Sequence, residues 1–161
     1  MSWTTPDLCD AHSDRLRIAS PLFRDFGGEP KFCGPAETIQ CFEDNSLIAD
    51  AVATEGRGRV LVVDAGGSIR CGMFGDNLAS KAIENGWAGV ILWGCIRDAE
   101  VIERLPLGVK AIGVHPLKSV KQGEGTLSCD VHFAGIDWHP GDTVYADRNG
   151  IVVSEAPLWG I

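Results

Sequence analysis

The chain has 161 residues, of which 45% are hydrophobic and 22% are charged, and its formal net charge is −8. This length and composition predict one globular domain spanning residues 1–161. The acidic balance and the lack of any Lys/Arg cluster argue against direct nucleic-acid binding, which needs basic side chains against the phosphates. An acidic surface remains suited to a basic protein partner.

No apolar run approaches the length of a membrane span, and residues 1–14 contain no secretory signal, so we expect a cytoplasmic protein without membrane contact. An even number of cysteines invites a disulfide interpretation, but a reducing compartment favours free, partly buried thiols. No C-x-x-C motif occurs, which disfavours a zinc knuckle. The six cysteines are Cys9, Cys33, Cys41, Cys71, Cys95 and Cys129.

Local signals predict the first elements of the chain. Thr5-Pro6 pairs a hydroxyl cap with proline at the first helical position, so a helix to about Ser13 is expected. Residues 14–31 contain several prolines and glycines and predict loop and short strand pieces. A strand over Phe32–Phe42 follows, and then Asp44-Asn45 is expected to cap a helix over Ser46–Glu55.

A βαβ unit is predicted in the middle of the chain. Arg59–Asp64 and Gly89–Trp93 are short apolar runs typical of buried strands, and a helix from Gly75-Asp76 to Asn85 lies between them. The two strands should therefore be parallel neighbours. In such sheets, ligands bind outside the carboxyl ends of the strands.

The C-terminal part is predicted to be all β after one short helix. Pro106 should end a helix over Ala99–Leu105, and a polar, Gly-rich segment predicts a mobile loop over Lys118–Ser128. Turn signals separate the expected strands Val109–Val114, Cys129–Phe133, Thr143–Ala146 and Ile151–Ser154.

Three kinds of chemistry converge at the expected carboxyl edge. Free backbone N–H groups at the helix start, Gly75–Leu78, suit an anion. Arg97 offers a planar set of donors, and Asp98 offers a hard oxygen ligand for a divalent cation. The structural alternative is that Arg97 and Asp98 form a strand-end ion pair, or that Asp98 caps the following helix.

Other candidates are weaker. Asp76 is expected to be the N-cap of its helix, and Glu103 is either an exposed acid or assists through water. No G-x-x-x-x-G-K-[ST], G-x-G-x-x-G or G-x-S-x-G motif is present, which disfavours a phosphate loop or a serine nucleophile. The four histidines show no metal-ligand spacing: His12, His115, His132 and His139.

The sequence resembles the family shared by 4-hydroxy-4-methyl-2-oxoglutarate aldolases and the regulators of ribonuclease activity A. The matching pattern is Asp76, a twenty-residue gap, Arg97-Asp98 and then Glu103. Further similar stretches are PDLCD (6–10), CFEDN (41–45), GRGRVLVVD (56–64) and YADRNGI (145–151). The resemblance implies an α/β fold of the swivelling β/β/α type, with a central barrel-like β core flanked by helices.

The resemblance also implies a function. It points to a class II aldolase that uses Mg²⁺ or Mn²⁺ to release pyruvate from 4-hydroxy-2-oxo acids, with oxaloacetate decarboxylation as a side activity. Asp98 would hold the metal, Arg97 would be catalytic, and Gly75, Asp76, Asn77, Leu78 and Arg97 would bind substrate. The alternative is a regulator that binds and inhibits a ribonuclease.

The family further implies a homotrimer or a dimer of trimers. The chain has five tryptophans, and aromatic residues are enriched at subunit contacts, so we expect some of them there. They are Trp3, Trp87, Trp93, Trp138 and Trp159.

Overall fold

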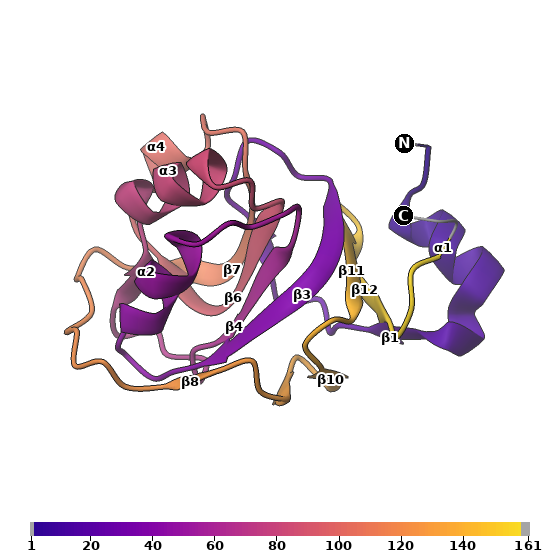
Figure 1. Ribbon diagram of the computed structural model, residues 1–161. Coiled ribbons are helices and arrows are strands. Elements are labelled where there is room, and N and C mark those ends of the chain that lie inside the picture. The colour runs from indigo at the N-terminus through magenta and orange to yellow at the C-terminus, as the bar shows by residue number, and fades with distance from the viewer. Residues whose placement is uncertain (1, 159–161) are drawn as a thin grey trace.

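The computed structural model describes residues 2–158 and has a mixed α/β fold, in which one large sheet is flanked by helices, as predicted (Figure 1). The helices in this range are α1 (Thr5–His12), the short 3-10 helix η1 (Ser13–Arg15), α2 (Ser46–Val52), α3 (Asp76–Glu84) and α4 (Ala99–Ile102). The strands are β1 (Leu16–Ile18), β2 (Arg24–Asp25), β3 (Phe32–Gln40), β4 (Val60–Asp64), β5 (Gly72–Phe74), β6 (Gly89–Ile96), β7 (Gly108–Val114), β8 (Thr126–Leu127), β9 (Val131–Phe133), β10 (Ile136–Trp138), β11 (Thr143–Asp147) and β12 (Gly150–Ser154).

The main path of the sheet runs β1-β12-β11-β3-β4-β6-β7-β2, with β5 added to β6 and β8 added to β3. Strand β3 joins an antiparallel half of the sheet to a parallel half. Its first residues pair antiparallel with β11, and Ala36–Gln40 pair parallel with β4. The predicted βαβ unit is confirmed, because β4 and β6 are parallel neighbours with Val62 opposite Ile91.

The sheet closes into a barrel-like core. The outermost strands β1 and β2 are joined by only five residues, 19–23. Such a segment spans at most ~20 Å, whereas the outer strands of a flat sheet with eight strands in its path would lie ~34 Å apart. The sheet must therefore curl until its edges approach one another.

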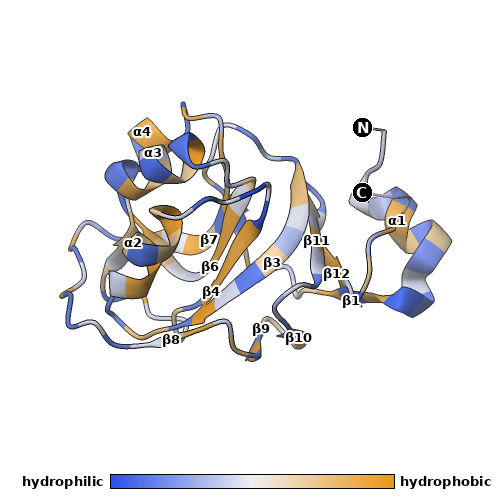
Figure 2. Ribbon diagram, in the orientation of Figure 1, coloured by the Kyte–Doolittle hydropathy of each residue, from blue (hydrophilic) through white to orange (hydrophobic). Residues whose placement is uncertain are grey.

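The parallel half is buried on both faces, which explains the near-continuous apolar runs in its sequence. Helices α2, α3 and α4 cover one face, where Leu61 and Leu92 pack with residues of the helices (Figure 1). On the other face, Val62 and Ile91 pack with residues of β11 and β12. The hydropathy colouring shows β4 and β6 as largely apolar, while the helices carry hydrophilic positions as well (Figure 2).

Two predicted helices are shorter than expected. The helix over Ser46–Glu55 ends at Val52, and the helix over Ala99–Leu105 ends at Ile102. In the first case the chain turns at once toward β4, and the hydroxyl of Thr54 donates to the Ala51 carbonyl. No helix in residues 2–158 is long and apolar enough to cross a membrane.

The three-residue strands β5 and β10 were not predicted from the sequence. The segment predicted as a mobile loop over 118–128 is anchored rather than free. It contains β8, and the Asp44 carboxylate accepts the backbone N–H groups of Gln122 (2.8 Å) and Glu124 (3.1 Å). Hydrogen bonds, first from the Ser46 hydroxyl and then from these backbone groups, hold the pKa of Asp44 well below its usual range.

Three of the five tryptophans are not available for a subunit contact. Trp3, Trp87 and Trp138 are buried within the chain, so they stabilise its own core rather than a subunit contact. Trp93 is partly buried and stacks on Phe133. Trp159 lies outside the described residues. The six cysteines are free thiols, as predicted.

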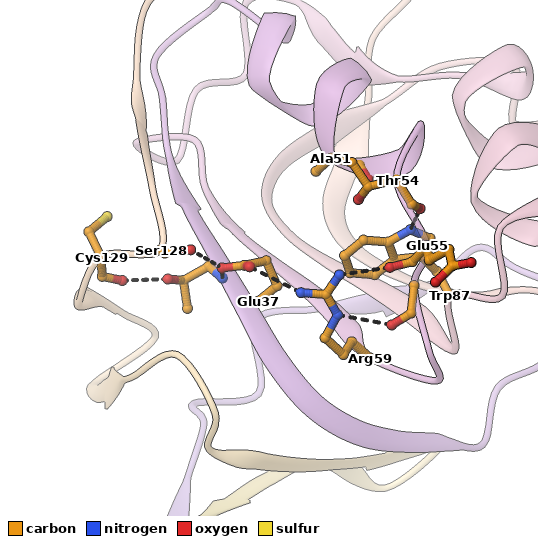
Figure 3. A network of polar contacts seen from close by, with 10 residues as sticks. Glu37, Ala51, Thr54, Glu55, Arg59, Trp87, Ser128 and Cys129 are labelled. Atoms are coloured by element: carbon orange, nitrogen blue, oxygen red, sulfur yellow. Dashed lines mark hydrogen bonds and ion pairs between the residues drawn. The ribbon is translucent and has the colours of Figure 1, made fainter.

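A polar network around Arg59 closes the corner between α2 and β4 (Figure 3). The guanidinium pairs with Glu37 of β3 at 3.1 Å and donates to backbone carbonyls of Glu55 and Gly56 at 2.9 Å each. It also lies over the Trp87 ring, 4.6 Å from the centroid.

The second oxygen of the Glu37 carboxylate accepts the Ser128 hydroxyl at 2.7 Å. The network therefore links β3 and β4 to the end of the 118–128 segment.

Helix α1 is fastened to the sheet by one buried carboxylate. Asp147, at the end of β11, accepts the Thr5 backbone N–H at 2.8 Å, the Thr5 hydroxyl at 2.6 Å and the Asn149 backbone N–H at 2.8 Å. Burial raises the pKa of Asp147, but these hydrogen bonds outweigh it and the net shift is downward. The contact therefore connects the N-terminal helix to the end of β11, although Thr5 and Asp147 are distant in sequence.

We expect Asp147→Asn to lower the free energy of unfolding by about 1–3 kcal/mol at pH 7, because a buried, hydrogen-bonded charge is lost. Because the pKa of Asp147 is lowered in the folded protein, its ionised carboxylate stabilises the fold at pH values above the ordinary pKa of about 3.9. This stabilisation is lost as the pH falls through the pKa that Asp147 has in the folded protein. Urea unfolding followed by circular dichroism at pH 7 and pH 3 measures this. The gap between wild type and variant should shrink at pH 3.

The matched control is Asp10→Asn, an exposed acid on the same helix. It should leave stability nearly unchanged at both pH values. Equal stability of wild type and Asp147→Asn at pH 7 would contradict the role assigned to Asp147.

Candidate functional site

The residues selected from the sequence meet at the carboxyl edge of the parallel strands. Arg97 follows the last residue of β6 directly, and α3 begins two residues after β5. Strand β5 brings them together, because it pairs with the end of β6 and the Arg97 backbone N–H donates to the Phe74 carbonyl at 2.9 Å. Arg97 and the start of α3 therefore lie together at this edge, where the sequence placed them.

Asp98 has an uncommon backbone conformation that directs its side chain toward α3. Its φ of 57° and ψ of 43° place it in the left-handed region, which aspartate tolerates better than most residues. Its carboxylate oxygen Oδ2 accepts the Asp76 backbone N–H at 3.1 Å. Asp98 holds the N-cap position of α4, as the alternative predicted, but its side chain makes no capping hydrogen bond there.

The start of α3 binds an anion, but that anion belongs to the protein. Asp76 is not the N-cap as predicted: Gly75 holds that position, and Asp76 is the first helical residue. The Asp76 N–H donates to Asp98, and the Asn77 N–H donates to the Asp76 carboxylate at 2.8 Å. Within the described residues, the Gly75 and Leu78 N–H groups have no acceptor, so they are the donors left for a ligand.

Two glycines provide the space that this arrangement needs. A Cβ on Gly75 would lie 2.6 Å from Oδ2 of Asp98 and 3.2 Å from Cγ of Arg97. A Cβ on Gly72 would lie 2.9 Å from Cβ of Arg97. Any side chain at Gly75 would displace the carboxylate, so this glycine is required by close approach rather than by its φ angle.

Arg97 is partly buried, and its guanidinium makes no ion pair or hydrogen bond with any residue in 2–158. The alternative prediction of an Arg97–Asp98 ion pair is therefore not supported. Several other arginines do have carboxylate partners, for example Arg17 with Asp142 at 2.6 Å. An unpaired, half-buried guanidinium is a ready binding group for a carboxylate or an oxyanion.

The donor set fits a small divalent cation held largely by water. One Asp98 oxygen is engaged with α3, and the other, Oδ1, has no partner among the described residues. Mg²⁺ commonly binds through one or two carboxylates and keeps several waters. No group of three or more His, Cys, Asp or Glu in residues 2–158 forms a metal cage, so Asp98 would be the main protein ligand.

The remaining predicted residues differ in position. Asn77 is exposed and Leu78 partly buried on the first turn of α3, while Glu103 is exposed just after α4.

His115, which was not predicted from the sequence to belong to the site, lies beside it. Its backbone N–H donates to the Ile96 carbonyl at 2.9 Å. The available signal was its position after the strand predicted over Val109–Val114.

A separate cleft of about 910 Å³ lies between η1, the end of β12 and the turn before β11. Its Asp142 carboxylate is already engaged, since Arg17 bonds to it and His139 also approaches it at 3.4 Å. The carboxyl edge is therefore the better candidate site, because its cation and its carboxylate oxygen are both available.

Comparison with known proteins confirms the family resemblance. The model of the RraA-like family, described as Aldolase/RraA, matches residues 5–153. A protein of Alkalilimnicola ehrlichii, provisionally named 4-hydroxy-4-methyl-2-oxoglutarate aldolase, is 54% identical over 158 residues, which are 98% of each chain. One of Azotobacter vinelandii with the same provisional name is 51% identical over the same share.

Solved structures share the whole fold. A protein from Geobacillus kaustophilus, named S-adenosylmethionine:2-dimethylmenaquinone methyltransferase, is 45% identical with a TM-score of 0.97 and covers 99% of both chains. The RNA-processing inhibitor RraA from Thermus thermophilis is 37% identical with a TM-score of 0.95, covering 100% of this chain and 98% of that one. These names describe different activities on one fold, so the chemistry must be argued from the site.

We expect Asp98→Asn to weaken Mn²⁺ binding at least tenfold while the fold is kept, because a neutral amide replaces a hard anionic ligand but retains an oxygen for the Asp76 N–H. Gly75→Ala should weaken it similarly, because its methyl group displaces the carboxylate. Isothermal titration with Mn²⁺ measures the affinity, and the melting temperature reports the fold.

Glu100→Gln is the matched control, since it removes an exposed carboxylate two residues away in α4. If Asp98→Asn and Glu100→Gln bind Mn²⁺ as tightly as wild type, Asp98 only anchors α3.

Proposed function

Because this chain belongs to the RraA-like (Aldolase/RraA) family, we propose that it is a divalent-metal-dependent aldolase. Its substrates are 4-hydroxy-4-methyl-2-oxoglutarate and similar 4-hydroxy-2-oxo acids, which it cleaves to pyruvate and a second 2-oxo acid. The observation that best supports this is the unpaired Arg97 guanidinium beside an Asp98 carboxylate that α3 holds by one oxygen and leaves open at the other.

The reaction needs stabilisation of one developing negative charge. When C3–C4 breaks, its electron pair stays on C3 and delocalises onto the 2-oxo oxygen, which gives a pyruvate enolate. The 4-hydroxyl loses its proton to an ordered water and becomes the carbonyl of the second product. Protonation of C3 then releases pyruvate. Arg97 would hydrogen-bond the enolate oxygen, where charge accumulates in the transition state.

The other residues bind and orient. The free N–H groups of Gly75 and Leu78 would hold the 1-carboxylate at the positive end of α3. Asp76 and Asn77 contribute by shaping the first turn, since their own N–H groups are already engaged. A bound Mg²⁺ or Mn²⁺ at Asp98 would supply Lewis-acid polarisation of the 2-oxo group.

The same enolate forms when oxaloacetate loses carbon dioxide, because the C3–C4 electron pair again remains on C3. Oxaloacetate decarboxylation is therefore the side activity we propose. It offers a simple assay, since its substrate is readily obtained and its product is again pyruvate.

A second candidate function is regulation of a ribonuclease. It is favoured by the 37% identity to the RNA-processing inhibitor RraA along the whole chain, and a net charge of −8 suits a basic protein partner. Both functions would be compatible if docking used a surface away from Arg97. The assembly we propose, a homotrimer or a dimer of trimers in the cytoplasm, would apply to either function.

For the aldolase, Arg97→Ala should lower kcat by about 100- to 1000-fold with a smaller rise in KM, because the contact strengthens in the transition state. Arg97→Lys should recover little, since an ammonium cannot reproduce the planar donors. Oxalate resembles the enolate in charge and shape and should inhibit wild type strongly and Arg97→Ala weakly. Steady-state pyruvate release with Mg²⁺ or Mn²⁺ measures all three.

The regulator hypothesis gives the opposite pattern, with no turnover in wild type and ribonuclease inhibition unchanged by Arg97→Ala. Equal turnover of wild type and both Arg97 variants would reject the aldolase mechanism.

The proposed assembly predicts a mass of three or six chains. Several large apolar side chains near the site are exposed in the single chain, including Leu117 at 61% and Val114 at 45%, and a subunit contact would shield them. Light scattering at micromolar concentration is the measurement, and a monomer there would contradict the assembly.

A further inference from the structure

Another cavity, of about 510 Å³, lies at the seam of the sheet, where the edge strands β1 and β2 approach one another. The walls of this seam cavity are the segment 18–25, the start of β12, the first residues of α1 and Lys110 of β7. Lys110 lies ~13 Å along the strand from the carboxyl end of β7. Among the described residues, the lining includes neither Arg97 nor Asp98. The seam cavity is therefore separate from the candidate site, and its volume is typical of a small-molecule site.

The wall of the seam cavity contains a buried ammonium group. The side chain of Lys110 is only 4% exposed, and its Nζ pairs with Oδ1 of Asp25 in β2 at 2.8 Å. Asp25 is its one polar partner in the part of the chain that the structure describes. An ammonium has three N–H donors, and burying a charge is costly unless its donors are satisfied. The unused donors of Lys110 are therefore available to an acceptor that enters the cavity.

A backbone donor lies on the free edge of β1 in the same cavity. Strand β1 ends the path of the sheet and pairs only with β12, with Ile18 opposite Val152. The Ala19 N–H donates to the Ile151 carbonyl, so the residues on either side of Ile18 carry the hydrogen bonds of this antiparallel pair. The N–H of Ile18 consequently points away from β12 and has no acceptor among the described residues. It is a second donor in the wall.

The charged groups of the cavity sum to one positive charge. Arg24 is a lining residue, but its guanidinium lies over the ring of Phe26, 5.0 Å from the centroid, and that ring packs against the helix-covered core. Lys110 and Asp25 offset each other. Arg148, exposed in the turn between β11 and β12, adds the remaining positive charge. This balance is complementary to a ligand with a single negative charge.

Apolar side chains from three separate segments form much of the remaining wall. The hydroxyl of Thr5 also lies there, but it is already engaged with Asp147 at 2.6 Å. Apolar walls with a few polar groups at defined positions are the usual composition of a small-molecule site. The apolar groups come from α1, the 18–25 segment and β12, and include Pro6, Ile18, Pro21, Phe23, Ile151 and Val152.

We propose that the seam cavity binds a small monocarboxylate with an apolar tail. The carboxylate accepts hydrogen bonds from the Lys110 ammonium and the Ile18 N–H, and Arg148 attracts it from the exposed turn. The tail packs against Pro21 and Ile151. Such a ligand connects the free edge of β1 to β7 and so stabilises the closed sheet. The proposal is independent of the aldolase activity, because the cavity and the candidate site share no residue of the catalytic machinery.

The physical basis of the selectivity is the combination of one net charge with an apolar wall. A neutral amide of the same shape leaves the cations without an anionic acceptor, and hydrogen bonds to charged groups contribute more than neutral ones. A dicarboxylate places its second charge against apolar side chains, where it has no partner. A monocarboxylate satisfies the donors and buries its tail.

The probe is 4-methylpentanoate, and the comparison compound is 4-methylpentanamide, which has the same tail and a neutral head. Titration of each into ¹⁵N-labelled protein, followed by amide chemical shifts, gives both the affinity and the location. We expect saturable binding of the carboxylate about tenfold tighter than that of the amide. The largest shifts should fall in residues 18–25 and 148–152.

Variants assign the contacts. Lys110→Met should weaken carboxylate binding about tenfold or more, and Arg148→Met about threefold. Arg104→Met is the matched control, since it removes another exposed arginine without a carboxylate partner in residues 2–158, at a position outside the cavity. Breaking a buried ion pair is destabilising, so the double variant Lys110→Met/Asp25→Leu, which replaces the pair by apolar side chains, is used if the single variant unfolds.

Arg97→Ala separates the seam cavity from the candidate site and should leave the affinity for 4-methylpentanoate unchanged. Equal affinity for the acid and the amide, absence of saturable binding, or full affinity in the folded Lys110 variant would overturn the proposal. Loss of binding in Arg97→Ala, with the largest shifts in residues 75–78, would also overturn it, because the carboxylate would then bind at the carboxyl edge.

Discussion

The candidate site depends on the hydrogen bond from the Asp76 backbone N–H to the Asp98 carboxylate. It is a charge-assisted bond at the positive end of α3, and it fixes one oxygen of the carboxylate while leaving the other available. It also holds the end of β6 against the start of α3, and so sets the position of Arg97. A side chain normally expected to cap its own following helix instead joins two elements that are adjacent only in the fold.

This hydrogen bond can form because the Asp98 side chain closely approaches the start of α3. The left-handed backbone at Asp98 turns its side chain back toward α3, and Gly75 leaves room for the carboxylate. Strand β5 connects the two parts of the site, since it pairs with β6 and leads directly into α3. The interior is close-packed, so one added methyl group at Gly75 would have to move either the carboxylate or the helix.

Arg97 differs from the charged groups that stabilise the fold. Arg59 with Glu37 closes a corner of the sheet, and Asp147 fastens α1, so these groups stabilise the fold through partners within the chain. Arg97 at the carboxyl edge lacks such a partner among the described residues, so its positive charge is available to an anion.

Periodicity and local signals in the sequence were sufficient for the βαβ unit, for the parallel pairing of β4 and β6, and for the location of Arg97 and Asp98, because apolar runs and strand-end positions are local properties. They were insufficient for β5, whose three residues become a strand only by pairing with β6. They did not predict the hydrogen bond from α3 to the Asp98 carboxylate, since its donor, Asp76, is 22 residues away and no local rule selects it over the adjacent helix. The approach of Gly72 to Arg97 and of Gly75 to Asp98 was decided only by tertiary structure, because the pairing of β5 with β6 brings these distant residues together.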